Sequence, residues 1–256
     1  MRTENKSDNR KALPKFLLWM LAGGLVGGIC GATAGFLGGS AAPEKLVETI
    51  HRCLIAVFPW SQWALLAVLG GGALLQYRRA KALFVSWDGE DEATMDRAEE
   101  CLSWSLLWVA LDQVLSFFFV AVGFWALDQA PDYPVWAAAQ FLLSFMASLA
   151  AMIVLQQKAV DLVKRMNPEK QGSVYDLKFQ KKWLASCDEN EQRQIGQAAM
   201  KSFTAVTITC IFSWAALVLL RIPFDIGVLP FFLVALIWGV SQVTYCLEAI
   251  RLGRHS

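Results

Sequence analysis

The sequence predicts an all-α, polytopic membrane protein with six transmembrane helices. The chain of 256 residues is 56% hydrophobic, and its apolar residues stand in long blocks rather than in amphipathic stripes, which is typical of membrane helices. Because helices satisfy their own backbone polar groups in hydrocarbon, each block is expected to be a helix of a single membrane domain, 1–256. The predicted spans are about 16–42, 58–75, 102–127, 134–155, 203–220 and 230–246.

The basic residues are distributed unevenly between the segments that connect these spans. All but Lys45, Arg52 and Arg221 of the 23 Lys and Arg residues stand near the two termini or in the segments 76–101 and 156–202. Cytoplasmic segments of membrane proteins carry an excess of Lys and Arg. We therefore predict that both termini are cytoplasmic and that 76–101 and 156–202 are cytoplasmic helical extensions.

Glycine recurs at every fourth position of the first predicted span, in a series that consists of Gly23, Gly27, Gly31, Gly35 and Gly39. Since a helix has 3.6 residues per turn, this spacing places the series on one stripe, where another backbone can approach closely. We expect another helix of the same chain to pack there. The alternative is a glycine zipper that lets helices slide, joins copies into a homo-oligomer or lines a pore.

The stretch Pro43–Phe58, which precedes the second predicted span, has an amphipathic pattern. Leu46, Ile50 and Leu54 recur at helical spacing, with charged residues on the opposite side. This pattern predicts a helix that lies along the outer surface of the membrane. We interpret it as a connector that rests in the head groups, and the alternative is a surface that binds something outside the cell, such as a peptide.

Two acidic clusters precede the third and fifth predicted spans. Asp88 stands three residues before Asp91, and Asp188 stands three residues before Glu191. An Asp followed three residues later by an acidic residue is typical of a helix N-terminus. We therefore expect a helix to begin at each cluster and to continue into the span.

Asp112 is an acidic residue that falls well inside the predicted hydrocarbon, in the third span. A charged side chain there costs about 2.5–3.5 kcal/mol on insertion scales, so we expect Asp112 to hold a proton, water or a polar partner. Gln113, Ser116, Gln140 and Ser144 are the available partners, and we group Asp112, Gln113 and Gln140 as an intramembrane polar site. The site is either a proton- or cation-sensing group in a polar pocket or a neutral carboxyl bonded to another helix.

Cations and aromatic residues alternate in the long segment between the fourth and fifth spans. Lys178, Lys181 and Lys182 accompany Phe179 and Trp183. Such a segment suits an anionic inner leaflet, and it equally suits an acidic protein partner. We favour the lipid contact and keep the protein contact as the alternative.

The sequence predicts neither an enzyme nor a metal or cofactor site. The six cysteines include no C-x-x-C pair and the two histidines form no metal-binding motif with them, and the signatures of serine hydrolases and P-loop nucleotide-binding proteins are absent. The formal net charge of +1 argues against direct binding of nucleic acid.

The chain resembles a known bacterial family. A glycine-rich first span follows a basic N-terminus, and "LKFQKKWLASCDENEQ" follows the turn "NPEKQG". These features resemble the integral membrane family called domain-of-unknown-function family 3169, found mostly in Gram-positive bacteria. The resemblance covers nearly the whole chain, is most specific at Phe179–Asp188, and implies a multi-pass protein of the bacterial cell membrane, with no reaction attached.

These observations favour a non-catalytic membrane component that senses, regulates or protects through a cytoplasmic partner, either a regulator or an ATPase. The alternative is a permease subunit or small transporter in which Asp112 belongs to a polar intramembrane site. The low number of charges in the predicted hydrocarbon favours the first function, because ion-coupled carriers usually have more.

Overall fold

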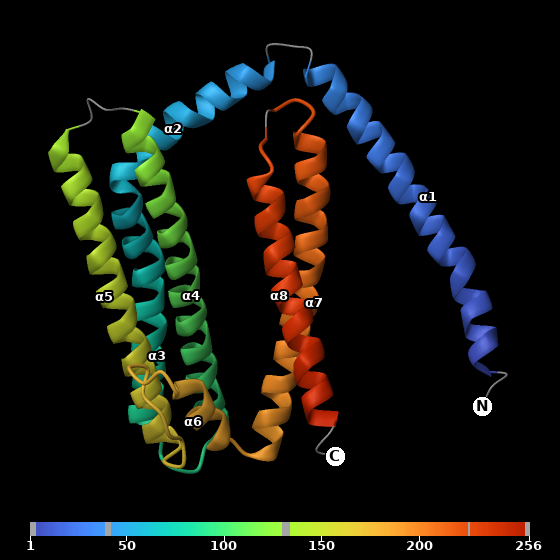
Figure 1. Ribbon diagram of the computed structural model, residues 1–256. Helices are drawn as coiled ribbons and strands as arrows, with labels where there is room; N and C mark the ends of the chain where they lie inside the picture. The colour runs from blue at the N-terminus through green and yellow to red at the C-terminus, as the bar shows by residue number, and fades with distance from the viewer. Residues whose placement is uncertain (1–3, 39–41, 130–133, 225, 254–256) are drawn as a thin grey trace. The chain divides into compact units, whose positions relative to one another are not determined.

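Figure 1 shows a computed structural model of the chain, which describes residues 4–38, 42–129, 134–224 and 226–253. These residues are helical almost throughout, and no strand occurs among them. The elements in chain order are α1 (Glu4–Gly38), α2 (Ala42–Leu65), the π-helix η1 (Leu66–Gly70), α3 (Gly71–Ser86), α4 (Glu92–Gln129), α5 (Val135–Met166), α6 (Phe179–Ala185), α7 (Glu189–Leu220) and α8 (Leu229–Gly253).

Five helices of the described chain are long and apolar enough to cross a membrane, and these are Pro43–Ser86, Glu92–Gln129, Val135–Met166, Glu189–Leu220 and Leu229–Arg251. They contain the second to sixth predicted spans. The first predicted span, 16–42, is not among them; in the part of α1 whose side chains the structure describes, the apolar helical stretch is Met20–Thr33.

The chain forms two compact units, one made of Met1–Glu48 with Ile195–Ser256 and the other of Thr49–Gln194. We call Thr49–Gln194 the bundle unit. In it α3, α4 and α5 pack side by side (Figure 1). The buried residues of α4 alternate at spacings of four and three, as in a coiled coil, and they include Ala98, Leu102, Ser105, Val109, Asp112 and Ser116.

The stretch Pro43–Phe58, predicted as a separate surface helix, is continuous with the second span. No break separates a surface helix ending at Phe58 from a following span, because Pro43–Ser86 is one continuous helix of 44 residues. Phe58 is fully buried and packs with Val122 and Phe141, so this stretch contributes to the bundle core. The predicted position along the membrane surface is not confirmed.

The glycine stripe of α1 is uncovered in the part of the chain that the structure describes. A Cβ atom added at Gly23, Gly27, Gly31 or Gly35 would meet no atom within 4 Å, and Gly39 lies outside the described residues. The expected packing of these glycines against another helix of the same chain stays a prediction. The zipper interpretation stays a prediction.

In the other unit, α7 and α8 pack as a pair. The side-chain amide of Gln242 donates a hydrogen bond to Thr207 Oγ1 at 3.2 Å. One helical turn further along, the rings of Phe203 and Tyr245 stack with centroids 4.8 Å apart. Many large apolar side chains of these helices are exposed, for example Phe212, Trp214 and Phe232, as expected for helices that face lipid.

Both acidic clusters cap helices, although one helix begins later than expected. α7 begins directly after Asp188, whose Oδ1 accepts a hydrogen bond from the Glu191 N–H at 2.7 Å, while the Asp188 N–H donates to the Glu191 side chain at 3.0 Å. α4 instead begins after Asp91, whose Oδ1 accepts from the Ala93 N–H at 3.1 Å. Asp88 accepts from two backbone N–H groups of the preceding turn, and these bonds lower the pKa of its carboxyl.

The predicted helical extensions are only partly helical. Segment 76–101 is interrupted between Ser86 and Glu92, and segment 156–202 contains an irregular stretch from Asn167 to Lys178 before α6. Pro168 and Gly172 lie in this stretch, and Gly172 has a φ of +131°, which side chains rarely permit. The residues that follow α5 therefore form a compact turn-rich segment, which we call the polar segment (167–188).

Candidate functional site

Polar side chains are buried along the centre of the bundle unit. They are Ser61, Gln62, Ser105, Asp112, Ser116, Ser144 and Ser148. Several join neighbouring helices, because Ser105 Oγ on α4 donates to the Ala73 carbonyl on α3 at 2.8 Å and Gln62 Nε2 on α2 donates to the Ser116 carbonyl on α4 at 2.9 Å. Such bonds replace the water that hydrocarbon cannot supply.

Asp112 lies close to the middle of α4 and is 1% exposed. Ser148 Oγ on α5 donates a hydrogen bond to Asp112 Oδ2 at 2.9 Å. The other carboxyl oxygen, Oδ1, is buried and has no hydrogen-bond partner in the described chain. A buried carboxyl that is only half satisfied is costly unless a proton, water or a cation completes it.

Two more buried oxygen atoms of the bundle unit have no partner among the described residues. Ser116 Oγ is one helical turn from Asp112 on the same face of α4, and Gln62 Oε1 belongs to the amide that bonds to the Ser116 backbone. Both atoms are buried and lack a hydrogen-bond partner within the described residues. The Asp112 carboxyl and the Ser116 hydroxyl, one turn apart on the same face, could bind a proton, a water molecule or a small cation, since hard cations prefer oxygen ligands.

No group of three or more His, Cys, Asp or Glu side chains that could hold a metal ion occurs among the residues that the structure describes. With one carboxylate, the Asp112 site suits a singly charged cation better than a divalent one, because divalent sites usually gather more acidic ligands.

The helices that face Asp112 are both irregular at its level. Ser105 contacts Ala73 and Ser116 contacts Gln62, so the antiparallel helices place η1 opposite Asp112. The buried residues of α5 also alternate at spacings of four and three. This alternation is interrupted at Ser144, Ser148 and Met152, which follow one another at two successive spacings of four. Such a stutter changes the local winding of a helix, and π-helical turns are frequent at functional sites.

The structure brings together only part of the predicted polar site. Gln113 is exposed, because the residue after Asp112 points about 100° away around the helix. Gln140 is half-buried and donates to the Pro59 carbonyl at 3.0 Å. It stands eight residues before Ser148, roughly 12 Å along α5. Ser144 donates to the carbonyl of Phe141 in its own helix.

Two residues were not predicted from the sequence: Ser148, which donates to Asp112, and Gln62, which donates to the Ser116 carbonyl. Both are polar residues in apolar spans, and Ser148 continues the four-residue spacing from Ser144. This spacing could have pointed to Ser148 as a buried residue. The partner of Gln62 could not be found in the same way, because it depends on the register between helices far apart in the sequence.

The polar segment folds back onto the ends of α4 and α5. Gln157 Oε1 on α5 accepts hydrogen bonds from the Ser173 hydroxyl at 3.2 Å and the Val174 N–H at 3.0 Å. Asn167 Nδ2 donates to Glu99 Oε1 on α4 at 3.2 Å. The polar segment is therefore bonded to the ends of both helices.

A buried lysine stabilises the polar segment. Lys170 is 8% exposed, and its ammonium group donates to Glu191 and, at 3.5 Å, to Cys187 Sγ. Burial disfavours the charged form, but the hydrogen bonds to Glu191 and Cys187 outweigh it and raise the pKa of Lys170. Neither Lys170 nor its ion pair was expected from the sequence.

The residues predicted to contact a partner lie on or next to α6. Phe179 and Trp183 are half-buried, with ring centroids 5.5 Å apart. Lys178, Lys181 and Lys182 are exposed. Lys182 pairs with Asp176, and this hydrogen bond, together with one from the Lys178 N–H, lowers the pKa of the Asp176 carboxyl. α6 thus presents its lysines outward, while its aromatic rings pack together.

The long apolar helices, with polar side chains buried between them, are typical of a helical membrane protein. The family model described as "Protein of unknown function (DUF3169)" matches residues 10–249, which is nearly the whole chain. The chain therefore belongs to this family, as the resemblance implied. No curated protein and no solved structure matches it.

Proposed function

We propose that the chain is a non-catalytic membrane component of the bacterial cell membrane that senses or regulates through a cytoplasmic partner. Asp112 is the group that responds, by taking up a proton or a small monovalent cation. The observation that carries the proposal is the buried carboxyl of Asp112, bonded to Ser148 through one oxygen and unbonded at the other. A polar group at this depth in a membrane helix is usually functional.

The proposed response begins where α4 meets η1 and α5. A proton or cation at Asp112 would add an interaction to Ser116 Oγ, and the π-helical turn opposite is the element whose winding can change. α4 and α5 also hold the polar segment, through Glu99 and Gln157. A shift between these two helices would therefore alter the surface that the polar segment offers to a partner.

The response at Asp112 is tested by the thermal stability of the purified protein in detergent. We expect the melting temperature of the unmodified protein to change with pH or when sodium replaces choline, by the equivalent of about 2.7 kcal/mol at a ligand concentration of 100 times Kd. Asp112→Asn should fold, because its amide oxygen can still accept from Ser148, and it should lose the response. The matched control is Asp128→Asn, which changes an exposed carboxyl of the same helix.

An unchanged response in Asp112→Asn would disprove the role of this carboxyl, as would a protein whose melting temperature depends on neither pH nor cation. Loss of the response in Asp128→Asn as well would place the responding group elsewhere.

The cytoplasmic partner is tested by affinity purification from the native membrane with mass spectrometry of the bound proteins. Lys178→Glu/Lys181→Glu reverses two exposed charges of the polar segment and leaves the ion pair of Lys182 in place. We expect the amount of an acidic partner recovered with this double variant to fall at least tenfold. The control Arg193→Glu on α7 should recover as much partner as the unmodified protein. Equal recovery with both would contradict docking on α6.

A permease subunit or small transporter is the second function that the Asp112 site supports, because intramembrane carboxyls also mark ion pathways. The identity of the recovered partner separates the two. A signalling or DNA-binding protein supports regulation, whereas an ATPase supports a permease. Cation flux into liposomes that contain the purified protein, abolished by Asp112→Asn, would favour a transporter.

A further inference from the structure

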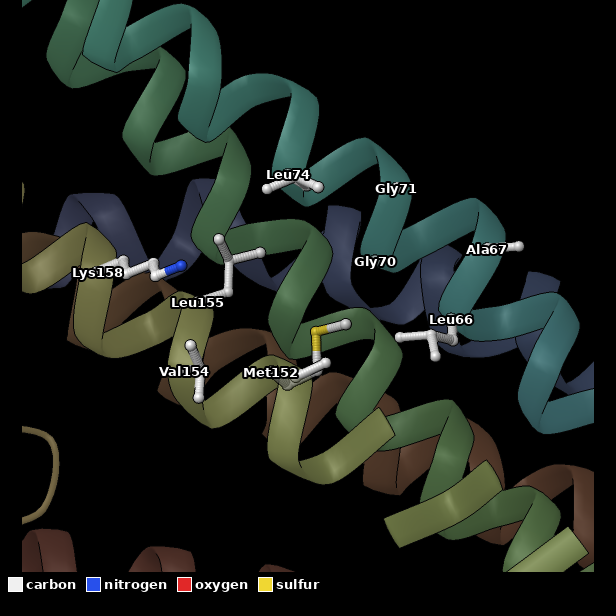
Figure 2. A pocket seen from close by; sticks show the side chains of 10 residues that line it. Leu66, Ala67, Gly70, Gly71, Leu74, Met152, Val154, Leu155 and Lys158 are labelled. Carbon is white, nitrogen blue, oxygen red and sulfur yellow. The ribbon is translucent and has the colours of Figure 1, made fainter. Parts of the chain in front are cut away.

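A groove of about 400 Å³ lies between η1 with α3 on one side and α5 on the other (Figure 2). Its apolar walls include Leu66 and Leu74 on one side and Val154 and Leu155 on the other. Gly71 helps to leave it open, because a Cβ atom added there would meet nothing within 4 Å. The volume lies within the range of about 300–1,000 Å³ that is usual for small-molecule sites.

A basic residue closes one end of this groove. Lys158 lines the groove, and Figure 2 shows its ammonium nitrogen directed along the wall toward Leu155. Lys158 is exposed and forms no ion pair with the described residues. The nearest carboxyl in its own helix, Asp161, accepts a hydrogen bond from Gln157 at 2.7 Å instead.

A second basic residue stands one turn beyond the α3 wall of the groove and is not itself one of the lining residues. Arg78 follows the groove residue Leu74 by one helical turn, and it is exposed. Ala80 on α3 and Ala159 on α5 belong to one core cluster, so the helix turns that carry Arg78 and Lys158 lie at similar depth in the bundle. The two cations therefore flank the end of the groove.

Both walls change from apolar to polar at this level. On α3 the apolar Leu74 and Leu75 are followed by Gln76-Tyr77-Arg78, and on α5 Leu155 is followed by Gln156-Gln157-Lys158. Such a change in a helix that can cross a membrane marks the depth at which hydrocarbon gives way to head groups. The apolar part of the groove thus lies at the depth of acyl chains, and its basic end lies at the depth of phosphates.

We propose that this groove is a binding site for one membrane phospholipid with an anionic head group. One acyl chain fills the apolar groove beside Leu66, Gly71 and Leu155, and the ammonium of Lys158 and the guanidinium of Arg78 hold the phosphate. Basic pockets between membrane helices recognise acidic lipids by this combination of charge and apolar contact. A free phosphate ion would leave the apolar groove unfilled. The site is separate from Asp112 and does not depend on the function proposed above.

The test is native mass spectrometry of the full chain, transferred to detergent from bilayer discs that contain equal amounts of phosphatidylglycerol and phosphatidylcholine. We expect the unmodified protein to retain one phosphatidylglycerol in at least tenfold excess over phosphatidylcholine. The double variant Lys158→Gln/Arg78→Gln should lower the retained phosphatidylglycerol at least tenfold. Arg79→Gln, which removes a neighbouring charge on another face of α3, should behave as the unmodified protein.

A second variant tests the groove itself. Gly71→Leu places a side chain in the open space without moving the backbone, so it should lower the retention of both lipids. Gly239→Leu on α8 is the matched control, because a Cβ atom there also meets nothing within 4 Å. Equal retention of the two lipids by the unmodified protein would overturn the proposal, as would unchanged retention by Gly71→Leu. A Gly239→Leu variant that loses the lipid equally would also overturn it.

Discussion

Replacing Gly123 by alanine is expected to destabilise the bundle unit by about 1–3 kcal/mol, the usual cost of overpacking a core. A Cβ atom at this position would stand 2.7 Å from Phe141 Cε1 and 2.8 Å from Phe141 Cζ. The ring has little room to move, because Phe141 is 2% exposed and packs edge-on against the buried ring of Phe58, with centroids 5.5 Å apart. The measurement is a reversible unfolding titration in mixed micelles.

A double variant shows whether this contact is the cause. Gly123→Ala/Phe141→Leu replaces the ring with a smaller side chain, so the two changes together should cost less than the sum of their separate costs. Gly239→Ala adds a methyl group in open space and should be close to neutral. If the free-energy costs of the two changes simply add in the double variant, or if Gly123→Ala is as stable as the original, the ring of Phe141 moves aside for the methyl group and the prediction is wrong.

Replacing Lys170 by methionine is expected to loosen the polar segment. The change removes the buried ammonium that joins Glu191 and Cys187 and keeps a side chain of similar length. Because Glu191 is partly exposed and can recover solvation, we expect a loss of roughly 1–3 kcal/mol rather than the larger cost of breaking a fully buried pair. Hydrogen exchange of the amides in 170–188 should therefore accelerate by about tenfold or more.

The control for Lys170 is Lys182→Met, which removes an exposed ion pair with Asp176 and should change exchange little. The pKa of Lys170 is raised above its ordinary value of 10.5, so its contribution is fully present at neutral pH and is lost only as the pH rises through the higher value. Equal acceleration by both variants, or none by Lys170→Met, would contradict a structural role for the buried ion pair.

The helical class, most of the span positions and the family could be predicted from the sequence alone. Apolar blocks are local features whose hydropathy adds up along the chain, so the helices around 102–127 and 134–155 were predicted close to their observed places. The position of Asp112 within one of these apolar blocks was likewise readable from the sequence. The cap at Asp188 was equally local, since a capping side chain and its partner are three residues apart.

The hydrogen-bond partner of Asp112 could not be predicted from the sequence in the same way. Asp112 was recognised because a carboxyl in an apolar block is conspicuous, but its bond to Ser148 joins residues 36 positions apart. Gln140 was an equally plausible partner by composition, and it bonds to Pro59 instead. The choice between them depends on the register of α5 against α4, which hydropathy does not specify.

The features on which the proposals rest arise from contacts between distant parts of the folded chain. The π-helical turn opposite Asp112, the groove beside Gly71 and the ion pair of Lys170 arise where several helices or turns meet. The glycines of α1 have the same limit, since their spacing predicts a smooth helix face but does not specify what packs on it. A pattern along one helix determines which face is smooth, polar or apolar, but what occupies that face depends on side chains from distant parts of the chain.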